Sequence, residues 1–333
     1  MKIALGHLGG LTPAIKTSLE DLGVETALPP PNTKLLLETG KEKISSGLCF
    51  PLKIALGNYL EVQKLEPDAV LFYSGCDLCN LPPANLLFKE ILNNQGYFPE
   101  TYFCSIHSKK HFIYSYFNVL TNITDKPADR VLMSMYLCGI KYNTFSFLDK
   151  VFYAIRPIFD DSTHCEKLYK EFWDKISLAT TVSSVEKLSF ELWELYRYYT
   201  SMKSPSFHRI GLIGDSYSLM EPSSHNYTDK TIGNLKVIVD KWSQNYLLPS
   251  ENANYLRTFC KINNLLCKKS GVFTSLEIKK ITKYTAEKYD GLIFISPMNC
   301  NPNETLRNAL NKITSEFNIP VLDLVVDEHD SNT

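Results

Sequence analysis

Three loops of the chain carry cysteine directly ahead of a stretch that we expect to be helical. Cys49 precedes Pro51, and proline is favoured in the first turn of a helix. Cys76 and Cys79 form a Cys-x-x-Cys pair after an apolar run, and Cys300 lies in a loop rich in proline and asparagine. The thiolate is the form of cysteine that binds metal, and a helix N-terminus favours it. These four cysteines are therefore candidate metal ligands.

The Cys-x-x-Cys pair is compatible with several chemistries. It could be half of a zinc site, a thioredoxin-like redox pair or part of a set of cluster ligands. A zinc ribbon needs a second such pair, which the sequence lacks, and the surrounding pattern does not match the small thioredoxin fold. Cys300 is too far along the chain from Cys79 for a local finger, so a site that used both would have to be built by tertiary structure. For any one cysteine alone, the ordinary role is that of a small buried hydrophobe.

Composition narrows the classes of protein and partner. The 333 residues include 35 Lys and Arg and 36 Asp and Glu, so the formal charge of −1 gives no signature of binding to nucleic acid or to an anionic membrane. No apolar run reaches the roughly 18–20 residues that a spanning helix needs. The N-terminal residues read as a strand and a turn rather than as a signal peptide. Since the nine cysteines are an odd number in a large chain, we expect a cytoplasmic protein with reduced thiols rather than a disulfide framework.

Alternating strand and helix signals at both ends of the chain predict open parallel α/β sheets. Strands are expected at 2–5, 24–28, 69–73, 209–213, 235–239, 292–295 and 321–326. Helices are expected at 11–22, 33–39, 51–64, 84–93, 276–288 and 304–317, and, in the middle of the chain, at 169–176 and 185–199. We therefore predict an N-terminal α/β lobe at 1–125, a helical connector at 126–205 and a C-terminal α/β lobe at 206–333.

The two expected lobes are similar in sequence. The run that begins at Asp68 matches the run that begins at Asp290, and each is followed within a few residues by cysteine. Because ligands of open α/β sheets bind outside the carboxyl ends of the strands, two Rossmann-like lobes that face each other would present these cysteines to one shared cleft. Coincidence between two ordinary buried strands is the alternative explanation.

Longer motifs in both lobes carry a resemblance to a known family. In the first lobe they are Pro29-Pro30-Pro31-Asn32-Thr33-Lys34, Leu37-Glu38-Thr39-Gly40 and Cys49-Phe50-Pro51-Leu52-Lys53-Ile54-Ala55-Leu56-Gly57-Asn58. In the second lobe they are Ile210-Gly211-Leu212-Ile213-Gly214-Asp215-Ser216-Tyr217, Ser296-Pro297-Met298-Asn299-Cys300-Asn301-Pro302 and Asp327-Glu328-His329. In these motifs the chain resembles the CoA protein activase family, also called acyl-CoA dehydratase activase-related proteins. That family is similar to the 2-hydroxyacyl-CoA dehydratase subunits and to the double-cubane cluster proteins.

The resemblance implies an iron–sulfur cluster, a 4Fe-4S or a double cubane, held by Cys49, Cys79 and Cys300. The family usually has Cys-Arg where this chain has Cys79-Asn80, so Cys76 could replace Cys79 or join it as a ligand. Three thiolates leave one iron of a cubane open to substrate, water or a bridging sulfide, and such clusters reach very negative potentials. The implied function is electron transfer: the protein would accept low-potential electrons from an ATP-driven activator that has its own cluster.

The resemblance also implies a place in an ATP-dependent reductase or acyl-CoA dehydratase system, and pairing with a homologous chain or with a second copy. Two alternatives stay open. The chain could be a non-catalytic two-lobed scaffold subunit without a cluster, or a zinc-binding protein that uses Cys76 and Cys79. The sequence has no P-loop, so we expect no tight binding of ATP by this chain itself.

Overall fold

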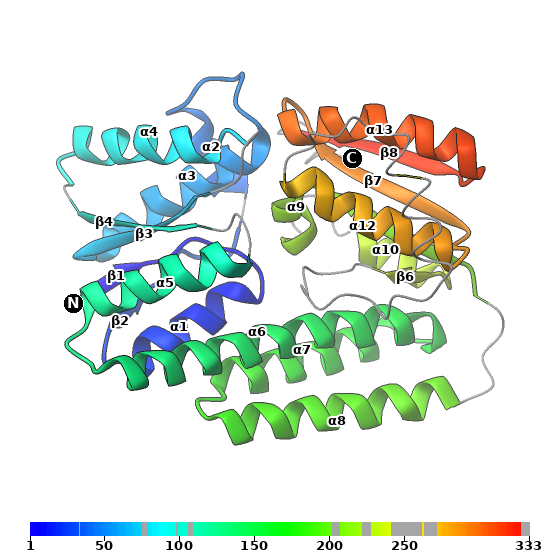
Figure 1. Ribbon diagram of the computed structural model, residues 1–333, viewed down its shortest axis with the longest axis horizontal. Coiled ribbons are helices and arrows are strands. Elements are labelled where there is room, and N and C mark those ends of the chain that lie inside the picture. The colour runs from blue at the N-terminus through cyan, green and yellow to red at the C-terminus, as the bar shows by residue number, and fades with distance from the viewer. Residues whose placement is uncertain are drawn as a thin grey trace. The chain divides into compact units, whose positions relative to one another are not determined.

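A computed structural model describes residues 1–32, 34–74, 79–97, 99–105, 109–201, 207–221, 228–240, 262 and 272–327 (Figure 1). Cys76, Cys260 and Cys267 lie outside the described residues, as do positions 328 and 329 of the last family motif. The chain divides into two compact units. Met1–Gly139 and Pro297–Pro302 belong to the first unit, and Ile140–Ser296 and Asn303–Val325 form the second.

The first unit contains a four-stranded parallel sheet in the order β2-β1-β3-β4. Its strands are β1 (Lys2–Ala4), β2 (Glu25–Ala27), β3 (Ala69–Ser74) and β4 (Glu100–Ser105). Its helices are α1 (Leu11–Asp21), α2 (Lys34–Lys41), α3 (Phe50–Val62), α4 (Leu81–Asn94) and α5 (Lys109–Ile123), with a short 3-10 turn at Gln63–Leu65.

The second unit contains a parallel sheet in the order β6-β5-β7-β8. Its strands are β5 (Arg209–Gly214), β6 (Ile238–Asp240), β7 (Gly291–Pro297) and β8 (Val321–Val326). Its helices around the sheet are α9 (Ser216–Met220), α10 (Thr228–Asn234), α12 (Val272–Ala286) and α13 (Asn301–Phe317). The predicted segment 126–205 contains α6 (Ala128–Ile155), a 3-10 turn at Arg156–Ile158, α7 (Ser162–Leu178) and α8 (Val182–Ser201), and the division between the units falls within α6.

The two sheets have the same topology. In each, the chain starts at the second position of the sheet, moves to the nearer edge strand, crosses back over its starting strand and continues to the far edge. The repeat extends to single hydrogen bonds. The backbone N–H of Lys2, at the start of β1, donates to Asp68 Oδ2 at 2.7 Å, and the N–H of Arg209, at the start of β5, donates to Asp290 Oδ2 at 2.7 Å. The predicted α/β class and the similarity of the two lobes are thus confirmed, whereas the shared cleft stays a prediction.

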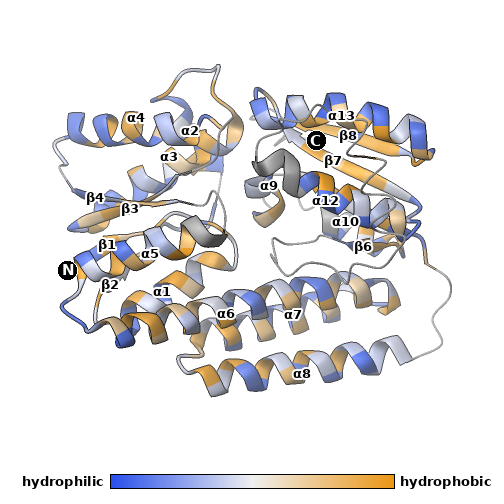
Figure 2. Ribbon diagram, in the orientation of Figure 1, coloured by the Kyte–Doolittle hydropathy of each residue, from blue (hydrophilic) through white to orange (hydrophobic). Residues whose placement is uncertain are grey.

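Continuous apolar strands form the centre of each sheet, because helices cover both faces of a parallel sheet. Every residue of β7 is buried, and Figure 2 shows this strand mostly in hydrophobic colours. In the first unit α2 packs directly on α3. A Cβ atom at Gly57 would lie 2.0 Å from the carbonyl oxygen of Leu36, and one at Gly40 would lie 1.9 Å from that of Lys53. Only glycine at these two positions lets the helix backbones approach this closely.

The structure adds elements that the sequence did not predict. These are β4, α5, the short helices α9 and α10, and the full length of α6. Among the described residues, no helix combines the length and the apolar character needed to cross a membrane.

Candidate functional site

The predicted ligand Cys49 lies at the N-terminus of a helix that is buried on nearly every side. Cys49 is the N-cap of α3, in an extended conformation, and Pro51 follows in the first turn. The residue is 8% exposed. Most of α3 is apolar and packs into the core, and this packing fixes the direction of its first turn. The partial positive charge of the helix N-terminus therefore lies beside the Cys49 thiol.

Cys79 occupies the same kind of position. It immediately precedes Asn80, the N-cap of α4, and it is half-buried. Its Sγ accepts a hydrogen bond from the backbone N–H of Leu81 at 3.4 Å. A sulfur that accepts a helix N-terminal N–H is placed to be stabilised as a thiolate.

Cys300 directly precedes α13 and is 7% exposed. The preceding residue, Asn299, has a positive φ of 63°, and the N–H of Cys300 donates to the carbonyl of Pro297 at 3.2 Å, so a tight turn sets the thiol at the start of the helix. The predicted position of all three cysteines ahead of helices is therefore confirmed, and each described candidate lies at a helix N-terminus.

Residues of all three segments contribute to one buried region of the first unit. Cys49 and Cys300 belong to one cluster of buried residues, which we call the first core cluster. Leu81, whose N–H bonds to Cys79 Sγ, packs against the same cluster. The other members are Ala4, Ala27, Leu52, Leu56, Tyr59, Leu60, Val62, Val70, Phe72, Ala84, Phe88 and Leu92. Cys49 and Cys300, 251 positions apart in the sequence, are thus brought to one region by the fold, because Pro297–Pro302 belongs with the first unit.

No group of three or more His, Cys, Asp or Glu that could hold a metal ion occurs among the residues that the structure describes. Such a group has its donors within bonding distance of one ion, as the ligands of a zinc site do. The thiolates of a cubane bind different irons and are spaced more widely. The geometry expected of a site for one metal ion therefore differs from the geometry expected of a cluster site.

The remaining described cysteines have a different environment. Burial raises the pKa of Cys104 to about 12, although a contact with the Ser115 hydroxyl opposes the shift. Burial likewise raises the pKa of Cys165 to about 11, despite the nearby positive charge of Arg156. These thiols stay protonated and act as small core residues, along with the buried Cys138.

Two polar residues of α3 were not assigned a role from the sequence. Lys53 is buried, and its Nζ donates to the carbonyl of Ser46 at 3.2 Å, in the loop that leads to Cys49. Asn58 is buried too, and its amide has no hydrogen-bond partner within the described part of the chain. The signal that could have found them is a lysine and an asparagine within an otherwise apolar 13-residue helix.

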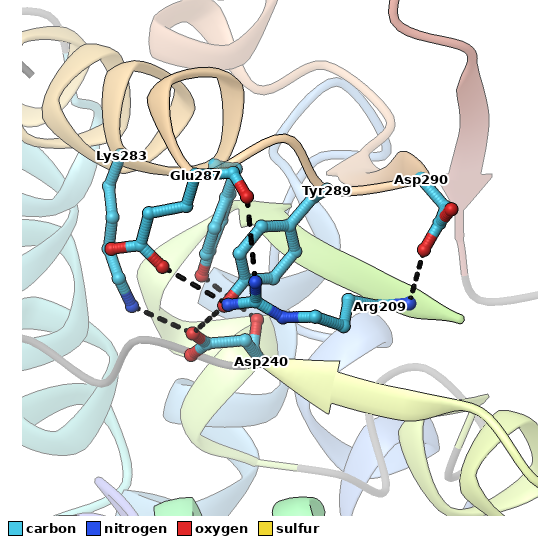
Figure 3. A network of polar contacts seen from close by, with 7 residues as sticks. Arg209, Asp240, Lys283, Glu287, Tyr289 and Asp290 are labelled. Atoms are coloured by element: carbon cyan, nitrogen blue, oxygen red, sulfur yellow. Dashed lines mark hydrogen bonds and ion pairs between the residues drawn. The ribbon is translucent and has the colours of Figure 1, made fainter. Parts of the chain in front are cut away.

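A network of polar side chains on α12 and the second sheet stabilises the fold (Figure 3). Asp240 Oδ2 accepts from Lys283 Nζ at 2.7 Å and from the Tyr289 hydroxyl at 2.6 Å. The guanidinium of Arg209 stacks on the Tyr289 ring at 3.9 Å and bonds Glu287. Burial raises the pKa of Tyr289, and Asp240 adds to the shift. Since these groups satisfy one another, the network ties α12 to β5 and β6.

Comparison with known protein families finds no family model that matches this chain, and no curated protein matches it.

Proposed function

We propose that the protein is an iron–sulfur redox protein related to the CoA protein activase family, with Cys49, Cys79 and Cys300 as cluster ligands. Cys76, three residues before Cys79 in the sequence, is the alternative or additional ligand. The observation that supports this most strongly is the association of three helix N-termini, each with a cysteine, around the first core cluster. A lone cysteine at a helix end is ordinary, but three such ends from distant segments are not.

The donor set fits the proposed cofactor. Soft thiolates are the ligands of iron–sulfur clusters, and three of them leave one iron without a protein thiolate. The N-termini of α3, α4 and α13 place partial positive charge where anionic sulfur ligands would lie. The apolar side chains of the first core cluster exclude water from the region, and exclusion of water and N–H···S hydrogen bonds both set cluster potential.

The proposed role is to accept low-potential electrons from an ATP-driven activator with its own cluster, as a component of a reductase or dehydratase system. Each chain would pair with a homologous chain or with a second copy. Reduced cysteine ligands and a reducible cluster suit a reducing compartment, which agrees with the cytoplasmic location that the sequence predicts.

Alanine substitutions of the cysteines test the assignment. We expect Cys49→Ala, Cys79→Ala and Cys300→Ala each to lose most of the iron and acid-labile sulfide found in anaerobically purified wild type. Cys165→Ala is the matched control, because its thiol is also buried but stays protonated in a different helix, and it should keep the full complement.

The pattern among the variants separates the alternatives. If Cys76→Ala loses the iron and Cys79→Ala retains it, Cys76 is the ligand in place of Cys79, and the proposal stands. If the wild type contains zinc in place of iron, and the zinc is lost with Cys76→Ala and Cys79→Ala but not with Cys49→Ala, the protein is instead a zinc-binding protein. Absence of both iron and zinc from wild type and from every variant would favour the scaffold subunit without a cluster.

A further inference from the structure

Buried polar groups gather at the carboxyl end of β5 in the second unit. On α12, Lys280 Nζ lies 2.7 Å from Glu277 Oε1, and both side chains are only 4% exposed. Glu277 Oε2 accepts the backbone N–H of Gly214, the last residue of β5, at 3.0 Å. The ion pair is therefore anchored at the end of the strand, where open α/β sheets bind ligands.

The neighbouring strand β7 ends at the same place. Gly214 is in register with Ile295, and the N–H of Asp215 donates to the carbonyl of Ile295 at 3.0 Å. Gly214 has φ 133°, and a Cβ atom there would lie 1.9 Å from the Ile295 carbonyl oxygen. Only glycine permits this close approach. β5 and β7 are also the adjacent strands from which the chain proceeds in opposite directions, which makes this the topological switch point of the sheet.

Ser296 follows Ile295 and is fully buried. Because side chains alternate along a strand, Ser296 lies on the same face of the sheet as Phe294. Phe294 belongs to a core cluster with Ile278 of α12, and Arg307 of α13 lies over its ring at 5.4 Å. The Ser296 hydroxyl thus points to the side that α12 and α13 cover, and it has no hydrogen-bond partner among the residues that the structure describes.

A second polar group of the same kind comes from α13. Asn303 is the third residue of that 17-residue helix, is 4% exposed, and its Nδ2 has no partner within the described ranges. In the first lobe, by contrast, the buried Asn85 of α4 donates its Nδ2 to the carbonyl of Tyr73 at 2.8 Å. Since buried polar groups are normally hydrogen-bonded, two unpartnered ones, one near the end of β7 and one in the first turn of the helix that follows it, indicate that an acceptor is missing.

We propose that this region, formed by Glu277, Lys280, Ser296 and Asn303 and called the β5–β7 corner, binds the phosphate or carboxylate group of a small molecule. The donors of the corner are the Ser296 hydroxyl, the Asn303 amide and the Lys280 ammonium, whose charge Glu277 balances. An oxyanion is the complementary acceptor, and the N-terminus of α13 favours negative charge. The acidic residue of the first turn of α13, Glu304, is exposed and is paired with Arg307.

This inference and the proposed cluster both draw on the N-terminus of α13, but they use different side chains, so each has its own test. Phosphorus-31 NMR of inorganic phosphate, titrated at constant ionic strength with chloride, is the direct test. With wild type we expect saturable line broadening. Ser296→Ala should weaken the apparent affinity about tenfold, because it removes one donor to a charged acceptor. The same variant should leave the melting temperature without phosphate unchanged or higher, since it removes a buried hydroxyl that has no partner in the described structure.

Ser177→Ala is the matched control. Its hydroxyl is another buried one without a partner in the described residues, on α7, and this variant should keep wild-type phosphate affinity. Displacement of phosphate by acetate would assign the corner to carboxylates as well, and failure of acetate to compete would restrict it to phosphate. Absence of saturable broadening in wild type, or equal loss in Ser296→Ala and Ser177→Ala, would overturn the proposal.

Discussion

At the scale of single residues, the proposed site depends on where the chain places sulfur rather than on how many cysteines it has. Cys49, Cys79 and Cys300 lie at helix N-termini, whereas Cys104 and Cys165 lie in surroundings that raise their pKa values to about 12 and about 11. The sequence could predict the helix-terminal positions, because proline and turn-forming residues mark them. It could not predict that Cys49 and Cys300 share one core cluster, since that depends on packing between distant segments. The buried Lys53 and Asn58 were missed for a related reason: their burial is a property of the packed helix.

One residue-scale prediction concerns Asp290. Its pKa is lowered from 3.8, mainly by the hydrogen bond from the Arg209 N–H and then by His208. A lowered folded-state pKa adds stability above the unfolded-state value, and this stability is lost as the pH falls through the folded-state pKa. We expect Asp290→Asn to be less stable than wild type near pH 6, by less than about 1 kcal/mol because the group is half-exposed. The difference should shrink as the pH falls below the unfolded-state pKa of 3.8 and through the lowered folded-state pKa, as chemical denaturation at a series of pH values would measure. A difference that grows on acidification would contradict this account.

At the scale of elements, the strands were more predictable than the helices. β3 and β7 follow from continuous apolar runs with turn residues on either side. β4 was missed because its six residues, ETYFCS, neither alternate cleanly nor form an apolar run. α6 was missed because apolar residues occur all round it: Val131 and Leu137 are buried, while Leu132 and Tyr136 are exposed. Without an amphipathic period, a helix signal is weak.

The close packing of α2 on α3 gives an element-scale prediction. Gly57→Ala would place a Cβ atom 2.0 Å from the Leu36 carbonyl oxygen and must separate the helices, so we expect a loss of about 2–4 kcal/mol in the free energy of unfolding. Gly139→Ala is the control. It lies within α6 with nothing within 4 Å of the new Cβ, and it should gain about 0.5–1 kcal/mol from helix propensity. Urea denaturation measures both, and a neutral Gly57→Ala would show that the helices do not depend on this contact.

At the scale of the whole molecule, the repeated 2-1-3-4 strand order shows that two similar units make up the chain. Neither sheet has a P-loop at its first strand, and the full sequence has none. We therefore expect isothermal titration calorimetry of the isolated chain to show no ATP binding tighter than millimolar. Any dependence of its redox state on ATP should require an added partner ATPase. Micromolar ATP binding by the chain alone would contradict the division of roles that we propose.

The most direct test of the central claim is the iron and acid-labile sulfide content of the wild-type protein, purified without exposure to oxygen. The account predicts a brown protein with iron and sulfide in equal amounts, about four of each per cubane and chain, whose colour is lost in air. Protein that is colourless and free of iron after anaerobic purification and after reconstitution with iron and sulfide would contradict it.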